Sequence, residues 1–190
     1  RYAVPEGGVA GLLKFVEDLR DFRPRSRQEY LEHQRKAPAA LKAAAQKILS
    51  LEKDQWSEAY QMALRVLLEN RIRTIRTDSS TRQRQTADLV KTFLKIRLER
   101  ELEPQDATLA MSAATTLEQA NRQELAAEAY RGFAELIAKE RHEDASDQQR
   151  LSAIVSKMEG AARRLSLLGN EMRLQGTAMD GTPFDWDAYR

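Results

Sequence analysis

The chain has 190 residues, of which 42% are apolar and 32% charged, with 31 lysines and arginines against 29 aspartates and glutamates. A chain of this length can bury a sizeable apolar core, so it needs no disulfide or metal ion to fold. It has no cysteine, which excludes a disulfide, a thiolate nucleophile and a zinc–thiolate site within these residues. The longest stretch without a charged side chain runs from Ala107 to Leu117. A membrane-spanning helix needs about 20 apolar residues, so the sequence predicts no membrane insertion.

Glycine and proline are scarce through most of the chain. Between Leu12 and Leu168 there are only two glycines and three prolines, while leucine and alanine dominate the apolar positions. Summed helix propensity over such windows favours helix throughout. The sequence therefore predicts an all-α body, built as a bundle of antiparallel helical hairpins.

The first three helices are predicted from one apolar stripe and two local signals. Apolar residues recur every three or four positions over residues 9–22, which predicts the first helix. Ser26 followed by Glu29 is a capping box that starts the second. Because proline suits the first turn of a helix, Pro38 is expected to separate this helix from a third at 39–53. The alternative that the two form one kinked helix stays open.

Three more helices follow from polar breaks. The fourth is expected to begin near Asp54 or Gln55 and to continue to about Ile72. A polar break at 78–80 precedes a fifth helix near 81–101, and Pro104 opens a sixth.

The last two helices are predicted by a turn and a second capping box. The chain turns around Asn121 into a seventh helix, whose apolar stripe ends near Ile137. Ser146 with Gln149 is expected to start the eighth helix. That helix should end at Gly169-Asn170, where a left-handed backbone is tolerated.

A short motif occurs twice. Leu51-Glu52 precedes Glu58-Ala59-Tyr60, and Leu117-Glu118 precedes Glu128-Ala129-Tyr130. The second occurrence also has the Ala-x3-Phe spacing of a tetratricopeptide repeat but lacks that repeat's Trp, Leu-Gly and closing Pro. Two interpretations stay open: a true helical repeat, and generic hairpins that look alike because they pack by common rules.

Charge is divided along the chain. Residues 65–100 carry ten basic against four acidic residues, and residues 101–190 carry ten against sixteen. Five arginines surround the turn between the fourth and fifth predicted helices, namely Arg71, Arg73, Arg76, Arg82 and Arg84. Clustered arginines can bind phosphate, but the net charge is only +2 and no aromatic residue interleaves the cluster. We expect no nucleic-acid partner, and favour docking onto an acidic face of the same chain or of another copy.

No residue pattern indicates catalysis, a cofactor or a metal, so the sequence provides no candidate residue for any of these sites. Glu29 and His33 lie four apart, but a di-iron bundle would need paired Glu-x-x-His elements. His142 lies in a polar stretch at a helix end, where a cation is favourable. The glycines at 7–11 follow no strand and precede no Lys-Ser, so they indicate a helix entry and not a phosphate loop. We expect no enzyme activity from this chain itself.

The last twenty residues follow a different pattern. Apolar and polar residues alternate from Met172 to Ala178, Asp180-Gly181 is a hairpin-type turn, and Phe184 and Trp186 alternate beyond it. This pattern predicts a short C-terminal β-hairpin.

The order of these elements resembles the opening of bacterial thioredoxin-like domains of the TlpA, ResA and redoxin type. In that family a strand, an Asp-Gly turn, a Pro-Phe pair and a short aromatic segment precede a valine-rich strand and the Trp-Cys-x-x-Cys motif. Val4-Pro5-Glu6-Gly7, the leucines at 12–19, and His33 with Lys36 are similar, more loosely, to the helical extension that precedes some of these domains. The resemblance implies that the parent protein is a thiol-disulfide oxidoreductase of the periplasm or cell envelope. The cysteine pair is absent, so no catalytic residue is carried over.

Together these features predict an all-helical domain at 1–170 and the start of a truncated thioredoxin-like domain at 171–190. The expected function is that of a non-catalytic accessory or interaction domain, with the missing redox domain, another protein or a second copy as partner. One alternative is an independent repeat-like scaffold that binds peptides in a concave groove. Another is an enzyme whose site lies between the helices and the missing domain.

Overall fold

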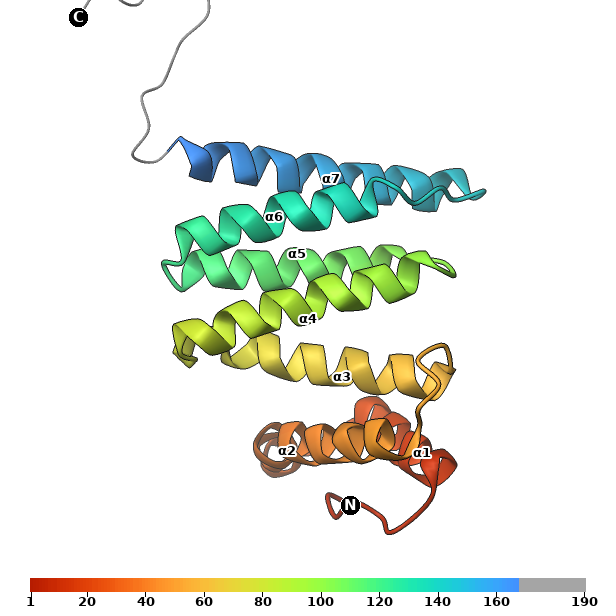
Figure 1. The fold of residues 1–190 in the computed structure, drawn as a ribbon. Helices are drawn as coiled ribbons and strands as arrows, with labels where there is room; N and C mark the ends of the chain where they lie inside the picture. The colour runs from red at the N-terminus through yellow and green to blue at the C-terminus, as the bar shows by residue number, and fades with distance from the viewer. Residues whose placement is uncertain (168–190) are drawn as a thin grey trace, which may run out of the picture.

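Seven α-helices make up the fold of the described residues. The computed structural model describes residues 1–167, and within them it contains helices and no strand. The helices are α1 (Val9–Asp21), α2 (Arg27–Leu51), α3 (Glu58–Thr74), α4 (Ser80–Leu98), α5 (Pro104–Gln119), α6 (Gln123–Ile137) and α7 (Ala145–Ser166), with a 3-10 turn, η1 (Ile75–Thr77), after α3. Figure 1 shows them stacked in chain order. The predicted all-α body is confirmed.

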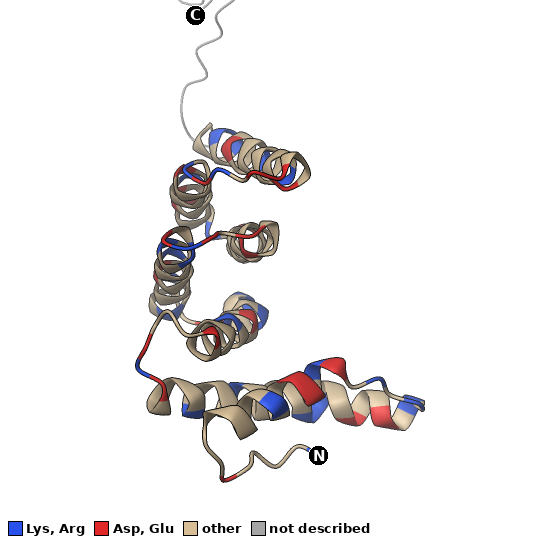
Figure 2. Cartoon of the chain, turned by 90° about the vertical axis from the view of Figure 1, so that its right-hand side faces the viewer, with Lys and Arg blue, Asp and Glu red and all other residues tan. Residues whose placement is uncertain are grey.

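Helices α3 to α7 form two layers. Each packs on the next helix in the chain and also on the next but one, so that α3, α5 and α7 lie in one layer and α4 and α6 in the other (Figure 2). Short turns join successive antiparallel helices, which is why neighbours in sequence are neighbours in space.

Helix α3 joins this stack to the N-terminal part of the chain. Its Leu64 and Leu68 belong to the core shared with α4 to α7. Its Ala63 and Val66 belong to a second core shared with α1 and α2. Because α3 is covered on both sides, its sequence is apolar around most of its circumference. In Figure 2, α2 runs across helices that are seen end on.

Small residues bring the central helices close together. The α5 side chains Ala107, Ala110, Ala113 and Ala114 are all fully buried. Alanine lets neighbouring helices approach closely and loses no side-chain entropy on burial. This makes α5 the centre of the stack, in contact with α3, α4, α6 and α7.

Several predicted helix ends are confirmed. Ser26 caps α2 by accepting a bond from the Glu29 amide at 3.2 Å, and α5 begins at Pro104. Gly8 precedes α1, as the helix-entry interpretation of 7–11 expected. Asn121 has φ 58°, and the next amide, Arg122, donates to the Leu117 carbonyl at 3.1 Å. This left-handed residue ends α5 and lets the chain reverse into α6.

The prediction that Pro38 separates two helices is wrong. Pro38 lies inside α2, so residues 1–167 contain seven helices where eight were predicted. Proline in a helix interior costs about 3 kcal/mol because it removes a backbone bond and crowds the preceding turn. The buried Ala37, Ala40 and Ile48 keep α2 continuous by packing along one face, and the Asn70 amide donates to the Pro38 carbonyl at 2.7 Å. Tertiary packing thus overrides the local signal.

Replacing Pro38 with alanine should therefore stabilise the protein. We expect a gain of about 1–2 kcal/mol in the free energy of unfolding, less than the full propensity difference because α2 has already adapted to the ring and alanine frees the unfolded chain. Urea denaturation followed by circular dichroism measures it. Pro24→Ala, in the linker between α1 and α2, is the control and should give no gain. A loss of stability in Pro38→Ala would contradict this account.

Two other helix starts differ from prediction. Helix α3 begins at Glu58, later than expected, because the Ser57 hydroxyl accepts the bond from the Tyr60 amide at 3.1 Å. Helix α7 is capped by Asp144, whose carboxylate accepts from the Ser146 and Asp147 amides at 2.8 and 3.0 Å. A carboxylate at a helix N-terminus also interacts favourably with the helix dipole, so Asp144 takes the place predicted for Ser146.

The repeated motif does not mark equivalent places. Glu58-Ala59-Tyr60 forms the first turn of α3, whereas Glu128-Ala129-Tyr130 lies in the middle of α6. The alternating layers thus arise from helix packing and not from this repeated motif. No helix of the described part is long and apolar enough to cross a membrane. The predicted domain boundary at 170 and the hairpin at 171–190 lie outside the described residues.

Candidate functional site

A groove runs between α5 and α7, two helices of the same layer. It consists of two adjoining hollows of about 440 and 590 Å³. Met111 and Thr115 of α5 and Lys157 of α7 line both hollows, so the two are continuous. We call this feature the α5–α7 groove.

The α5 side of the groove is free of charge over residues 107–117, in a chain that is 32% charged. Its three outward hydroxyls are bonded within their own helix. Thr108 donates to the Pro104 carbonyl at 2.8 Å, Ser112 to the Thr108 carbonyl at 2.9 Å, and Thr116 to the Ser112 carbonyl at 2.7 Å. Because these hydroxyl protons are already satisfied, covering the face leaves no donor unpaired.

The α7 side contributes apolar surface and one cation. Ile154 and Ala161 are half-buried, as is Met111 opposite. Lys157 is exposed and makes no ion pair with any residue of the described part. The groove thus combines an apolar strip with a single uncompensated positive charge.

A bonded pair closes one end of the groove. Arg164 of α7 donates to Glu118 of α5 at 2.8 Å, and this bond holds the pKa of Glu118 below its ordinary value. The Tyr130 hydroxyl of α6 donates to Glu118 at 3.1 Å and lies 3.0 Å from the Thr115 hydroxyl. Burial raises the pKa of Tyr130 above its usual range. Three helices are therefore joined at this end.

A second polar cluster lies where α3, α4 and α5 meet. Asp106 is fully buried, and Arg65 and Arg97 both donate to its carboxylate, the latter at 2.8 Å. Arg97 also donates to the Gln61 side-chain oxygen at 2.5 Å and pairs with Glu103 at 3.3 Å. Because the two guanidinium groups are compensated inside the protein, this cluster joins helices and does not expose a site for an anion.

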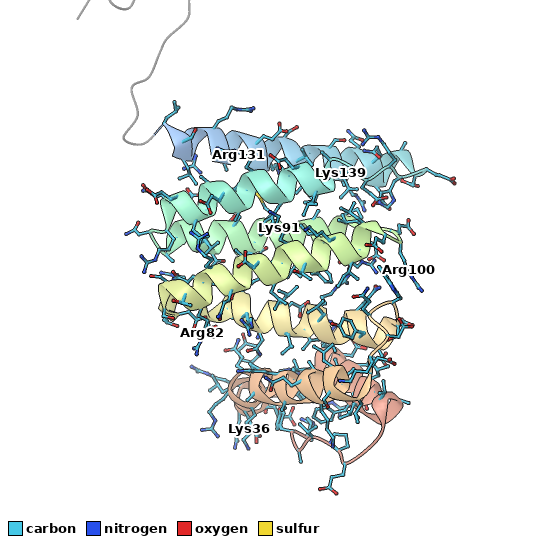
Figure 3. The ribbon with its side chains drawn as sticks, in the orientation of Figure 1. Lys36, Arg82, Lys91, Arg100, Arg131 and Lys139 are labelled. Carbon is cyan, nitrogen blue, oxygen red and sulfur yellow. The ribbon has the colours of Figure 1, made fainter. Side chains whose placement is uncertain are left out.

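The charge division of the sequence is partly neutralised within the fold. Arg65 and Arg97 pair with α5, and Arg84 of α4 pairs with Glu128 of α6 at 3.3 Å. Arg82 pairs with Asp78. These four arginines therefore pair with acidic residues of the same chain, whereas Arg71, Arg73 and Arg76 make no ion pair with any described residue. Figure 3 labels six cations, which lie on α2, α4 and α6 or directly after α4 and α6.

The two histidines have structural surroundings. The hydroxyl of Tyr2 lies 3.4 Å from the His33 ring nitrogen, and the Phe22 ring centroid lies 5.0 Å from that of His33. Glu29 accepts instead from the Arg25 amide at 2.8 Å, so it does not pair with His33. Within residues 1–167, no three His, Asp or Glu side chains are grouped to hold a metal ion.

His142 connects the loop after α6 to the loop before α5. Its Nε2 lies 2.8 Å from the Leu102 carbonyl and its Nδ1 lies 3.4 Å from Glu101, while Glu140 accepts from the Leu102 amide at 3.2 Å. The side chain is only 5% exposed. The bond to the Leu102 carbonyl, with the nearby Glu140 and Glu101 carboxylates, raises the pKa of His142 above 6.5.

This raised pKa predicts a pH-dependent stability. Protonated His142 keeps its bond to the Leu102 carbonyl and forms an ion pair with Glu101, so its contribution is complete below pH 6.5 and is lost as the pH rises through the folded-state pKa. We expect the urea midpoint to fall over that range. His142→Gln should flatten the dependence, whereas His33→Gln should keep it. An unchanged profile in His142→Gln would show that another group is responsible.

The groove was not identified from the sequence. The charge-free stretch 107–117 was noticeable, and the spacing of Thr108, Ser112 and Thr116 puts three hydroxyls on one helical face. That signal could have marked α5. No local signal shows that α7, nearly forty residues later, forms the other wall, because this depends on the layer arrangement.

Comparison of the chain with protein-family models, curated proteins and solved structures found no match. The assignment to a thioredoxin-like oxidoreductase is wrong: no family or relative supports it, and the described residues contain helices and no strand. Gly-Thr, Asp-Gly and Pro-Phe are common turn residues, so their order in a short tail is weak evidence of kinship. The redox function and the envelope location rested on that resemblance and have no other support.

Proposed function

We propose that this chain is a helical scaffold that binds a segment of a partner protein in the α5–α7 groove. The observation that carries the proposal is the α5 face itself, which is free of charge and has its hydroxyl protons bonded internally. Binding requires that polar groups lose water without losing partners, and most surfaces of a highly charged protein cannot meet this condition. The two-layer stack supports the groove on rigid helices, which lowers the entropy lost on binding.

The two-layer arrangement of the helices favours peptide binding over a purely structural role for the groove. Stacked helical hairpins hold grooves between helices of one layer, and such grooves suit peptide segments. Met111 and Ile154 provide apolar contact, and the Glu118 and Arg164 pair defines one end.

A peptide display experiment tests the proposal. A library of random seven-residue peptides is selected for binding to the full chain, and the affinity of the enriched peptides is measured by fluorescence anisotropy. We expect Met111→Arg to weaken binding at least tenfold, because it places a charge in the apolar strip. Ser112→Trp should do the same by filling the groove from an exposed position.

The matched control is Thr92→Arg, an exposed position on α4 in the other layer. It should leave peptide affinity unchanged, and circular dichroism should show that all three variants are folded. Failure to enrich any peptide, or peptides that bind the groove variants as tightly as the unmodified protein, would overturn the proposal.

A further inference from the structure

We infer that the occupant of the α5–α7 groove is an extended segment of about five residues with an acidic side chain. This inference rests on the proposed function and specifies the chemistry of the partner. Three features carry it, namely the row of oxygens on α5, the length of the groove, and the cation on α7.

The oxygens of Thr108, Ser112 and Thr116 form a row of hydrogen-bond acceptors. Each hydroxyl uses its proton within α5, so each oxygen keeps a lone pair that can accept a further bond. Residues four apart on a helix are separated by about 6 Å along the axis. On one edge of an extended chain the backbone N–H groups recur every two residues, or about 6.6 Å. The row therefore matches the amide groups along one edge of an extended segment.

The groove's length sets the size of the segment. From Thr108 to Gln119 the α5 side measures about 16 Å at the rise of a helix. An extended chain advances about 3.3 Å per residue, so about five residues fill the groove. A helical partner does not fit as well, because the amide protons of its interior are bonded to its own carbonyls and cannot reach the row.

Lys157 defines the charge of the segment. It lies in the middle of the groove, lines both hollows and has no ion-pair partner within the described residues. Arg164 is already paired with Glu118. A carboxylate beside Lys157 completes the charge balance, and an apolar side chain one or two residues away contacts Met111 and Ile154.

The peptides enriched in the display experiment test these features. We expect aspartate or glutamate at one position, next to an aliphatic or aromatic residue. Lys157→Met should weaken their binding about fivefold and reduce its dependence on salt. The control is Lys95→Met, an exposed lysine of α4. Peptides that bind the groove without an acidic preference would overturn this inference but leave the proposed function intact.

Methylation of the peptide backbone tests the extended conformation. N-methyl groups at alternate positions remove the amide donors along one edge. We expect methylation at one set of alternate positions to lower the affinity of the peptide about fivefold or more per methyl group. Methylation at the other set should leave the affinity unchanged. Thr108→Val and Thr116→Val, which keep the shape but remove the oxygen, should weaken the unmethylated peptide similarly. Equal sensitivity at all positions, or a helical bound peptide, would overturn the inference. Failure of all binding would instead overturn the proposed function.

Discussion

Replacing Asp106 with alanine is expected to lower the free energy of unfolding by about 3–5 kcal/mol. The carboxylate is fully buried and holds Arg65 of α3 and Arg97 of α4 against the start of α5. Its loss leaves two partly buried guanidinium groups facing each other, and removing one partner from a buried ionic cluster costs this much because the remaining charge stays desolvated. The Glu103 amide also loses its bond to the Asp106 carboxylate, at 3.1 Å.

Urea denaturation monitored by circular dichroism measures this effect. Asp88→Ala, an exposed aspartate of α4, should change stability by less than about 0.5 kcal/mol. A triple variant with Asp106→Leu, Arg65→Met and Arg97→Met should recover most of the loss, since apolar residues can replace a buried ionic cluster. If Asp106→Ala were as stable as the unmodified protein, the cluster would not join the helices energetically.

The Tyr130→Ala variant should lose about 3–5 kcal/mol. The Tyr130 ring is 2% exposed and lies in the core shared by α3 to α7, so its removal leaves a large cavity that the helices cannot fill. Tyr130→Phe separates the hydroxyl from the ring. It should lose only about 1 kcal/mol, the net value of the bonds to Glu118 and Thr115.

The difference in stability between Tyr130→Ala and Tyr130→Phe separates the contribution of ring packing from that of the hydroxyl. Tyr30→Ala, at a tyrosine that is 50% exposed on α2, is the matched control and should lose less than about 1 kcal/mol. The ionisation of Tyr130, followed by its ultraviolet absorbance, should occur above the ordinary tyrosine pKa because the ring is buried. A Tyr130→Phe variant as unstable as Tyr130→Ala would mean that the hydroxyl network, and not packing, holds α5, α6 and α7 together.

The predictions from sequence succeeded or failed according to the range of the interaction. Ser26, Pro104 and Asn121 marked real helix ends because capping and left-handed turns depend on residues within one turn. The prediction from Pro38 was wrong because contacts from elsewhere in the chain oppose the helix-breaking effect of the proline. Asp144 took the cap from Ser146, a competition between two neighbours that residue preferences alone do not resolve.

The C-terminal resemblance failed for a related reason. Turn residues recur in many unrelated chains, so a short ordered set of them carries local conformational information and little about ancestry. The helical periodicity of the body, which extends over seven elements, was the more reliable signal.

By itself, the sequence determined that the described part of this protein is helical, where most of its helices begin and end, and that one face of α5 has no charge. These properties follow from backbone preferences and from apolar spacing within each helix. Only the tertiary structure decided that α5 and α7 share a layer, that Asp106 lies between Arg65 and Arg97, and that α2 continues through Pro38. Each depends on contacts between segments far apart in the chain, whose free energy is set by packing that no local pattern specifies.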